Sequence, residues 1–252
     1  MKQEFPYSYL KIPDKCLLDK AVYKKYFYDN AKFSVTDKKW FTKDIDRIRW
    51  KYTLKPGSTL IFAVKEEDYH YDEIAVIEFE LDNDQHIDRL ADIIHRTIPY
   101  PLMIVFRGEE WVRFSVADKR FNKADDQAAT IKEYWITDRI KEQLQDSVDK
   151  AFVEQLSYER QPRLNLKVFY KAWIDAFIAY KVSRVTGEFE MLDEQAKKKK
   201  RIEALNEYRV MEEEVAYLRS KLKKEEAFNE KVKLNVDIKK LEKQLKHSAK
   251  QL

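Results

Sequence analysis

Residues 73–81, with the sequence Glu-Ile-Ala-Val-Ile-Glu-Phe-Glu-Leu, are the strongest strand signal in the chain. β-branched and aromatic side chains fit a pleated sheet, so we expect this segment to lie within one. Glu78 and Glu80 stand two positions apart, which places them on the same face of a strand. Because these carboxylates alternate with apolar residues, the pattern is typical of a strand with one buried and one exposed face.

Turn and alternation signals predict further strands on both sides of this segment. Alternation upstream stops at Pro56-Gly57, and an apolar run downstream begins directly after Pro101. Gly108 then suits the tight turn of a hairpin. The further strands are predicted at residues 48–54, 59–65, 102–106, 111–116 and 134–136.

Apolar residues at helical spacing predict the helices that connect and follow these strands. Asp14 is a candidate N-cap for the first helix and Asn165 for the last, which Gly187 ends or bends. The predicted helices cover residues 17–27, 36–46, 87–94, 146–158 and 166–185. Strands combined with these helices predict an α+β fold, in which a mixed or antiparallel sheet carries flanking helices.

Residues 188–252 differ sharply in composition from the rest of the chain. They contain no Gly or Pro, and 17 Lys or Arg with 14 Asp or Glu make nearly half of them charged. Such a segment buries too little apolar surface to fold as a globule, but it can form a long helix with one narrow apolar seam. We therefore expect an α+β body at residues 1–140, a helical connector packed on the body at residues 141–187, and a long charged helix or coiled-coil arm at residues 188–252.

Two series at heptad spacing predict the seam of this coiled-coil arm. The seam residues are Met211, Val215, Leu218 and Leu222 in the first series, and Leu234, Ile238, Leu241 and Leu245 in the second. The two series do not share one register, because steps of three and four from Leu222 lead to Glu225 and Asn229. A stutter in one helix and a bend between two helices both fit this break. The rod is the favoured form, because no Gly or Pro marks a turn.

Bulk composition excludes several classes of protein. The net charge is +4, of which the arm carries +3, so the body is not a basic DNA clamp. The single cysteine, Cys16, permits no internal disulfide and is expected to be buried. The three glycines leave no phosphate-binding loop, which excludes an ATPase. The start of the chain lacks the apolar run of a signal peptide, and no stretch reaches the roughly 18 apolar residues of a membrane helix. We expect a cytoplasmic protein that does not enter a membrane.

Candidate catalytic or metal-binding residues are few. Glu78 and Glu80 resemble the acids of a metal-dependent nuclease, but residues 102–108, the next strand, lack the Glu-x-Lys pair that such a core requires. A structural role for both carboxylates is therefore favoured over metal binding. The histidines, which are dispersed, are each expected to have a surface or capping role; they are His70, His86, His95 and His247. The sequence predicts no catalytic residue, no metal ligand and no cofactor.

Basic residues in the arm are the candidate nucleic-acid contacts. The run consists of Lys197, Lys198, Lys199, Lys200 and Arg201. A solvated helix surface is the favoured interpretation, and non-specific contact with phosphates is the alternative. A second set, with the same two interpretations, comprises Lys239, Lys240, Lys243, Lys246 and Lys250. In the body, Arg49, Lys51, Arg113 and Lys119 stand near Trp50, Tyr52, Trp111 and Phe114, where packing is favoured over stacking on single-stranded nucleic acid.

Three stretches resemble a bacterial family of unknown function. They are residues 73–81 quoted above, His-Arg-Thr-Ile-Pro-Tyr-Pro-Leu-Met-Ile-Val-Phe at residues 95–106, and Lys-Lys-Glu-Glu-Ala-Phe-Asn-Glu-Lys-Val-Lys-Leu-Asn at residues 223–235. Members of that family combine an N-terminal α+β domain with a C-terminal coiled-coil arm. They are typically encoded beside a helicase and a DNA methyltransferase, in restriction-modification or antiphage-defence clusters. The resemblance implies a pathway and a partner, but no site residues.

The sequence therefore favours a non-enzymatic accessory subunit of a bacterial DNA-processing complex. Its body and its arm would bind partner proteins, with the helicase or the methyltransferase of the same system as the expected partner. Homo-oligomerisation through the arm is a further expectation. A non-specific nucleic-acid-binding module and a divergent metal-dependent nuclease are the two alternatives.

Overall fold

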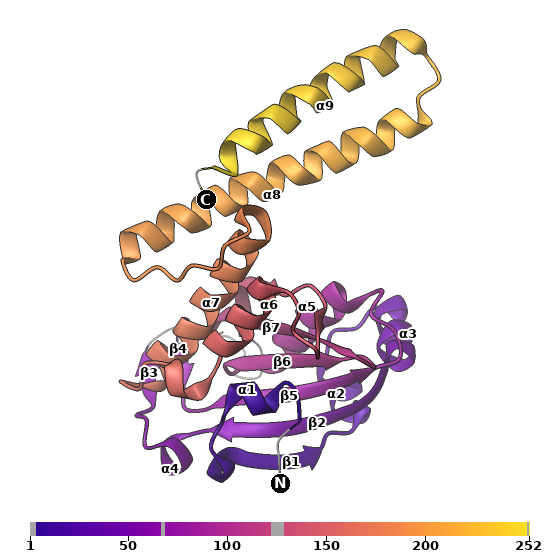
Figure 1. Ribbon diagram of the computed structural model, residues 1–252. Helices are drawn as coiled ribbons and strands as arrows, with labels where there is room; N and C mark the ends of the chain where they lie inside the picture. The colour runs from indigo at the N-terminus through magenta and orange to yellow at the C-terminus, as the bar shows by residue number, and fades with distance from the viewer. Residues whose placement is uncertain (1–3, 67–68, 122–128, 251) are drawn as a thin grey trace. The chain divides into compact units, whose positions relative to one another are not determined.

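The computed structural model describes residues 4–66, 69–121, 129–250 and 252 (Figure 1). The chain divides into two compact units, Met1–Phe177 and Ile178–Leu252. The division falls inside one helix, α7 (Leu166–Thr186), which begins in the first unit and ends in the second.

The first unit is built around one seven-stranded sheet. Its strand order is β1 (Leu17–Ala21), β2 (Ile45–Leu54), β5 (Ile74–Leu81), β6 (Leu102–Arg107), β7 (Trp111–Phe121) and β8 (Ala129–Ile136), and β9 (Ile140–Lys141) pairs with β7. A separate hairpin joins β3 (Val64–Glu66) and β4 (Tyr69–Tyr71). Only the β5–β6 pair of the described sheet is parallel, and all its other pairs are antiparallel. The predicted α+β fold with a mixed or antiparallel sheet is confirmed, and the described sheet is mixed and mostly antiparallel.

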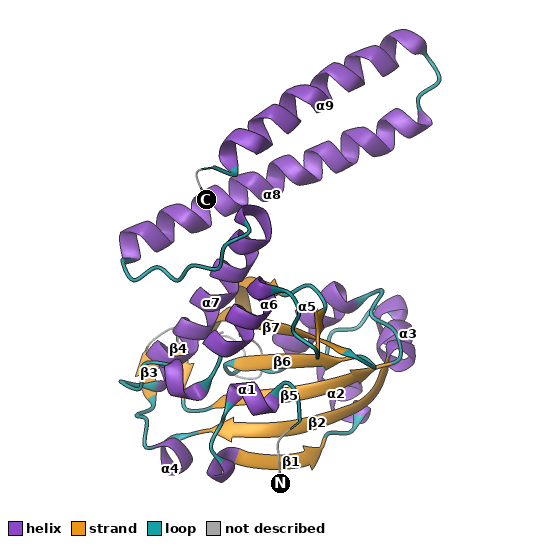
Figure 2. Ribbon diagram, viewed as in Figure 1, coloured by secondary structure: helices purple, strands orange, loops and turns teal. Residues whose placement is uncertain are grey.

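Helices flank this sheet (Figure 2). In chain order they are α1 (Tyr7–Leu10), the 3-10 turn η1 (Asp14–Cys16), α2 (Lys24–Asn30), α3 (Val35–Asp44), α4 (Pro56–Thr59), α5 (Ile87–Thr97), α6 (Ser147–Gln155), the 3-10 turn η2 (Tyr158–Arg160) and α7. Helix α5 connects the parallel strands β5 and β6, which require a crossover of this kind.

Strand β5 is buried on both faces. On one face Ala75, Ile77 and Phe79 belong to a core that also includes Leu90 and Ile94 of α5. On the other face Ile74 and Val76 are equally inaccessible and Glu78 is only 5% exposed, whereas Glu80 near the end of the strand is half-buried. The prediction of a half-exposed strand is therefore wrong, because a sequence pattern cannot show that helices cover both faces of the sheet.

The second face of the sheet is closed by α6 and α7. The Tyr170 hydroxyl on α7 bonds to backbone groups of two strands, donating to the carbonyls of Leu102 at 2.9 Å and Ala117 at 3.1 Å. The Phe152 ring of α6 packs edge to face against Phe114 on β7. One tyrosine thus holds the helix against β6 and β7.

The prediction of one helix at residues 17–27 is wrong. Residues Leu17–Ala21 form β1, which pairs with β2 at the sheet edge, and α2 begins only at Lys24. Every residue of β1 is exposed, so its apolar spacing does not correspond to a buried helical stripe. The open edge of β2 provides backbone partners that a sequence pattern cannot reveal. The predicted strand at residues 59–65 is also displaced: Thr59 ends α4, Phe62 forms an isolated bridge with Asn165, and the strand itself is Val64–Glu66.

The caps of the later helices follow the predictions from the sequence. The Asn165 side chain accepts a hydrogen bond from the Val168 N–H at 2.9 Å and so caps α7. Gly187 directly follows that helix with φ 85°, a left-handed conformation that glycine adopts without steric cost. Local signals were sufficient here because a cap depends on few neighbouring residues.

The second unit contains a hairpin of two helices, α8 (Gln195–Lys224) and α9 (Phe228–Ser248), which pack against each other. The favoured rod is therefore wrong, and the alternative of two helices is the observed form. The side chain of Glu225 accepts hydrogen bonds from the N–H groups of Glu226 and Ala227, both at 3.0 Å. This carboxylate satisfies backbone donors at the break, so the turn needs neither glycine nor proline.

Candidate functional site

The interface within the helical hairpin is built from the predicted seam. Val215 of α8 and Leu234 and Ile238 of α9 are buried. The other five predicted seam residues are half-buried: Met211, Leu218, Leu222, Leu241 and Leu245. Arg219 of α8 and Glu242 of α9 add an ion pair of 2.6 Å. Both heptad series thus lie on the more buried sides of α8 and α9, within one chain.

The outer face of α9 carries an exposed apolar stripe. Phe228, Val232 and Val236 are 77%, 46% and 60% exposed. Their spacing of four keeps them on one stripe, which lies about 160–200° around the helix from buried Leu234 for the two valines. Apolar side chains on one exposed stripe are typical of a contact surface.

Exposed lysines continue this stripe toward the C-terminal end of α9. They are Lys239, Lys243 and Lys246. Steps of four and three keep them on the same side of the helix as Val232 and Val236. We name these three lysines together with Phe228, Val232 and Val236 the α9 outer face. It has an apolar half and a basic half.

The basic run at the start of α8 is only partly available for an external ligand. Arg201 binds within its own unit: it pairs with Glu190 at 2.7 Å and donates to the Leu252 carbonyl at 3.1 Å. Lys197 pairs with Glu194 at 2.7 Å, and Lys199 lies 3.9 Å from Glu203. These lysine pairs are exposed and therefore weak, whereas Arg201 is held by several contacts.

Glu78 lies in a buried ion pair. Its carboxylate accepts hydrogen bonds from Arg107 Nε and from the Tyr7 hydroxyl, both at 2.8 Å. Burial and the neighbouring carboxylate of Glu78 raise the pKa of Tyr7 well above its usual value. A metal ion at Glu78 would have to displace a guanidinium. Glu80 is less buried and lies 4.0 Å from Arg47.

Reasoning from the sequence missed the cations beside Glu78, because it examined the next strand along the chain only for a Glu-x-Lys pair and not for a partner such as Arg107. In space β5 also pairs with β2, and the register sets Arg49 opposite Glu78. Asp19 of β1 receives Arg49 Nε at 3.0 Å and Lys51 Nζ at 2.9 Å, so these two cations hold the pKa of Asp19 down at about 2. The charges on this side of the sheet are thus paired with one another.

Two histidines make contacts with other segments. His95 is fully buried, and its Nε2 lies 3.0 Å from Ser115 Oγ. Burial, and then the charge of Lys119, lower the pKa of His95 well below its usual value. His86 stacks on Trp40 at 4.0 Å, and its Nδ1 lies 2.6 Å from Asp44 Oδ2. The expected surface or capping role is wrong for His95, because α5 turns it into the core.

Contacts of Lys119 and Arg113 within the body favour a role in packing over the binding of single-stranded nucleic acid. Lys119 Nζ donates to the carbonyls of Ile98 at 2.7 Å and Tyr100 at 3.0 Å. Arg113 Nε donates to the Thr137 carbonyl at 2.7 Å. Cys16 is buried as expected, and burial raises the pKa of its thiol.

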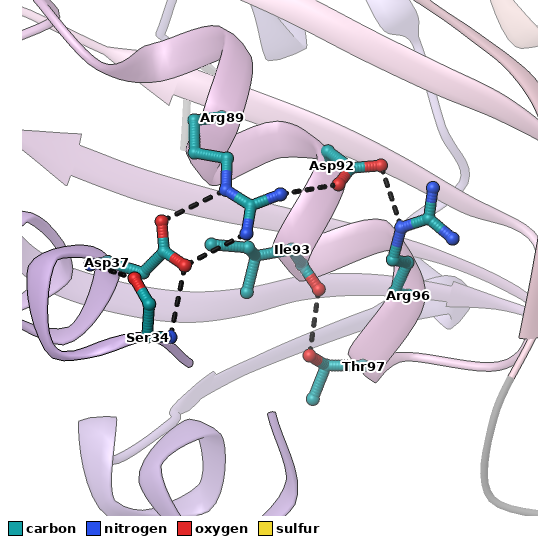
Figure 3. A network of polar contacts seen from close by, with 7 residues as sticks. All are labelled: Ser34, Asp37, Arg89, Asp92, Ile93, Arg96 and Thr97. Carbon is teal, nitrogen blue, oxygen red and sulfur yellow. Dashed lines mark hydrogen bonds and ion pairs between the residues drawn. The ribbon is translucent and has the colours of Figure 1, made fainter. Parts of the chain in front are cut away.

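A network of ion pairs joins α3 to α5 (Figure 3). Arg89 of α5 reaches both carboxylate oxygens of Asp37 at 2.9 Å, and Asp37 also forms the capping box of α3 with Ser34. Asp92 accepts from Arg89 at 3.1 Å and from Arg96 at 2.8 Å. Because Asp37 is buried, Arg89 stabilises the fold by compensating its charge.

The described part of the chain contains neither a cluster of metal-binding side chains nor a helix that could cross a membrane. Within residues 4–66, 69–121, 129–250 and 252, no three His, Cys, Asp or Glu side chains group in a way that could hold a metal ion. Over the same residues, none of the helices combines the length and the apolar character needed to cross a bilayer.

Comparison with known proteins gives one family. Searches of curated proteins and of solved structures return no match. A family model described as a domain of unknown function, DUF4391, matches residues 10–245, which cover most of each unit. The chain therefore belongs to the DUF4391 family.

Proposed function

We propose that this protein is a non-enzymatic accessory subunit that binds a larger bacterial DNA-processing machine through the α9 outer face and through its body. The observation that carries this proposal is the exposed apolar stripe of α9. Phe228, Val232 and Val236 remain exposed although α9 buries its opposite side against α8. A partner surface would remove these side chains from water, which stabilises a complex.

The partner is proposed from the resemblance of the sequence. Families of this kind lie beside helicase and methyltransferase genes in restriction-modification or antiphage-defence clusters, so either enzyme of the same system is the proposed partner. A helical hairpin suits this role, because it presents a long surface without a pocket for a small substrate.

The geometry of Glu78 supports an accessory role over a nuclease. Its carboxylate is engaged by Arg107 and Tyr7 rather than open to a metal ion. A general nuclease assay in Mg²⁺ and Mn²⁺ tests this point. Cleavage of DNA that is abolished by Glu78→Ala or Glu80→Ala would replace the proposal with the nuclease hypothesis.

The test of the proposed function is affinity capture from the native host. The full chain with a small tag is compared with a Val232→Glu/Val236→Glu variant, and bound proteins are identified by mass spectrometry. We expect the helicase or the methyltransferase with the wild type and a strong loss with the variant. A matched control is Glu213→Gln, an exposed change on α8. Capture that is the same for all three chains contradicts docking through α9.

A non-specific nucleic-acid-binding module remains the second candidate function. Exposed lysines at the start of α8, which are Lys197, Lys199 and Lys200, favour it together with the basic half of the α9 outer face, since exposed lysines along a helix can contact successive phosphates. It differs from the first proposal in needing no protein partner, and its test is the salt dependence of DNA binding described below.

A further inference from the structure

Helix α8 carries an exposed apolar stripe of its own. Val210 is 65% exposed and Tyr217 is 61% exposed. They stand seven positions apart, so they share one side of the helix, about 140–160° around it from buried Val215. Both side chains therefore remain in water although α8 buries its other side against α9, which lies beside it (Figure 1).

Three exposed glutamates lie on the same stripe. Glu203 and Glu207 precede Val210, and Glu214 stands between Val210 and Tyr217. Positions 203, 207, 210, 214 and 217 are separated by steps of four and three, which is the spacing of a heptad stripe. We name these five residues the α8 outer face. It combines two apolar side chains with three negative charges.

The charges of the α8 outer face are largely free to meet an external surface. Among the described residues, one ion pair engages these glutamates, that of Glu203 with Lys199 at 3.9 Å, and it is exposed and therefore weak. Arg209 lies about 100° around the helix from Val210. The other cations on this side of α8 lie beyond the ends of the face, at Lys199, Lys200 and Lys221.

The α9 outer face has the opposite charge. Its three lysines form no ion pair with the described residues. The acidic side chains of α9 lie on other sides of the helix: Glu230 pairs with Lys233 at 2.5 Å and Glu242 with Arg219 at 2.6 Å. Asp237 lies about 100° around the helix from Val236. One hairpin thus presents an acidic and a basic outer face, each with apolar side chains.

The two outer faces match when they are aligned antiparallel. If Tyr217 is set opposite Val232 of a second copy, apolar side chains meet at one end of the contact. Position 203 then stands opposite position 246, and position 207 within one residue of position 243. Two pairs of opposite charge form there, Glu203 with Lys246 and Glu207 with Lys243.

We propose that the α8 outer face binds the α9 outer face of a second copy of this chain. Within one chain the two faces cannot meet, because α8 and α9 already touch through the seam on their other sides. The faces differ from each other, so the contact is heterologous. It leaves one α8 face and one α9 face free, and these can bind further copies.

This inference goes beyond the proposed function and involves one of the same surfaces. A second copy on the α9 outer face covers the side chains that a companion protein would bind, so the two contacts exclude each other. Few side chains take part, and an interface below the standard size is expected to be weak. Self-association should therefore depend on protein concentration and on salt.

Sedimentation equilibrium of the purified full chain, freed of nucleic acid, tests self-association. At low salt we expect the weight-average mass to rise with concentration above that of one chain. At high salt it should return toward the mass of one chain, because salt screens exposed charges. A chain that stays monomeric at every concentration and salt overturns the proposal. So does an association that salt leaves unchanged.

Charge exchange tests which faces meet. Glu203→Lys/Glu207→Lys and Lys243→Glu/Lys246→Glu each place like charges across the contact, so we expect each variant alone to associate at least about tenfold more weakly. A mixture of the two variants, or one chain with all four substitutions, pairs opposite charges again and should regain the mass of the wild type. A loss that neither combination restores overturns the proposal, whether it reflects misfolding or another interface.

The matched control is Lys223→Glu/Asp237→Lys, which keeps the net charge and changes two exposed residues off both faces. It should associate as the wild type does. An equal loss in this control would mean that the contact is not confined to the outer faces, and the proposal falls.

Capture from the native host separates this inference from the proposed function. Glu203→Lys/Glu207→Lys leaves the α9 outer face intact, so the companion protein should still be captured at least as strongly as by the wild type. If the wild type is monomeric while capture is lost in Val232→Glu/Val236→Glu, self-association is wrong and the accessory role stands. If charge exchange controls the mass while no variant changes capture, docking of a companion through α9 is wrong and self-association stands.

Discussion

Two ionisable side chains, those of Lys119 and His95, are buried inside the first unit. Burial lowers the pKa of Lys119 well below its usual value, although its ammonium group donates to two carbonyls at the C-terminal end of α5. Burial, and then the neighbouring charge of Lys119, lower the pKa of His95 well below its usual value. Both favour the neutral imidazole, whose Nε2 lies beside the Ser115 hydroxyl.

The lowered pKa of His95 makes the stability of the fold depend on pH. In the unfolded chain the imidazole takes up a proton below about pH 6.5, whereas in the folded chain it stays neutral. The contribution to stability is thus complete above pH 6.5 and decreases as the pH falls. Between about pH 7.5 and 5.5 we expect a loss of about 1 kcal/mol more for the wild type than for His95→Gln. Urea unfolding at both pH values measures the difference, and equal losses would contradict a neutral buried imidazole.

Arg89 and Arg96 offer a matched pair of residues on one helix. Arg89 compensates the buried carboxylate of Asp37, whereas Arg96 pairs only with Asp92 and is 55% exposed. Arg89→Met should therefore lower the free energy of unfolding by about 2–3 kcal/mol, because an unpaired charge remains buried. Arg96→Met should cost less than about 0.5 kcal/mol. Denaturant titrations decide the point, and equal costs would mean that Asp37 is satisfied without Arg89.

Arg89 also holds the pKa of the Asp37 carboxyl well below its usual range, with help from Ser34. A lowered carboxyl pKa stabilises the fold above about pH 4 and loses that contribution as the pH falls toward the folded-state value. This acid range lies below the range in which His95 acts, so the two effects can be measured separately.

At the scale of elements, the α8–α9 hairpin depends on the packing of its two helices against each other. Most of the stability of a helix in a protein comes from packing of its apolar face, so α9 is expected to gain most of its stability from packing on α8. Ile238 is buried in that contact, whereas Val236, two positions away, is 60% exposed. Substitutions at Ile238 therefore test the packing of the hairpin, whereas substitutions at Val236 test its exposed surface.

Ile238→Asp should open the hairpin, because it places a charge in the buried seam at a cost of several kcal/mol. We expect lower helicity by circular dichroism and an earlier thermal transition. Val236→Asp is the matched control and should leave both signals unchanged while weakening capture of the partner. The same loss of helicity in both variants would show that α9 is not held by its seam.

At the scale of the whole molecule, the hairpin changes which surfaces of the second unit are expected to contact other molecules. Residues of both heptad series lie on the more buried sides of α8 and α9 within one chain. Exposed groups of the second unit include the α9 outer face, Lys197, Lys199 and Lys200 at the start of α8, and Val210 and Tyr217. Contacts of this unit with other molecules are therefore expected on exposed sides rather than at the seam.

DNA binding, where it occurs, should be weak and without sequence preference. Phosphate contacts release counterions, so the logarithm of the affinity should fall by about 0.9 per contact for each decade of salt. Changing Lys197, Lys198, Lys199 and Lys200 to Gln should flatten that slope equally for all sequences. Arg201 is kept, because it holds Glu190 and the Leu252 carbonyl. Fluorescence anisotropy measures the slope, and binding that stays tight at high salt would contradict phosphate contact.

The amino-acid sequence by itself determined the elements whose signals are local. Alternation marked β2 and β5, and an apolar run after Pro101 marked β6. Asn165 marked the start of α7, and the heptad spacing marked the seam residues of α8 and α9. Such features depend on side chains a few positions apart, and a linear pattern records them.

Only the tertiary structure decided which distant segments meet. It paired β1 with β2 instead of forming a helix, buried Glu78 against Arg107, and turned His95 into the core. It also folded α9 back on α8, where Glu225 replaces the glycine that a turn was expected to need. The physical reason is that burial and ion pairing between remote residues depend on which surfaces cover one another, and that is a property of the whole packed chain.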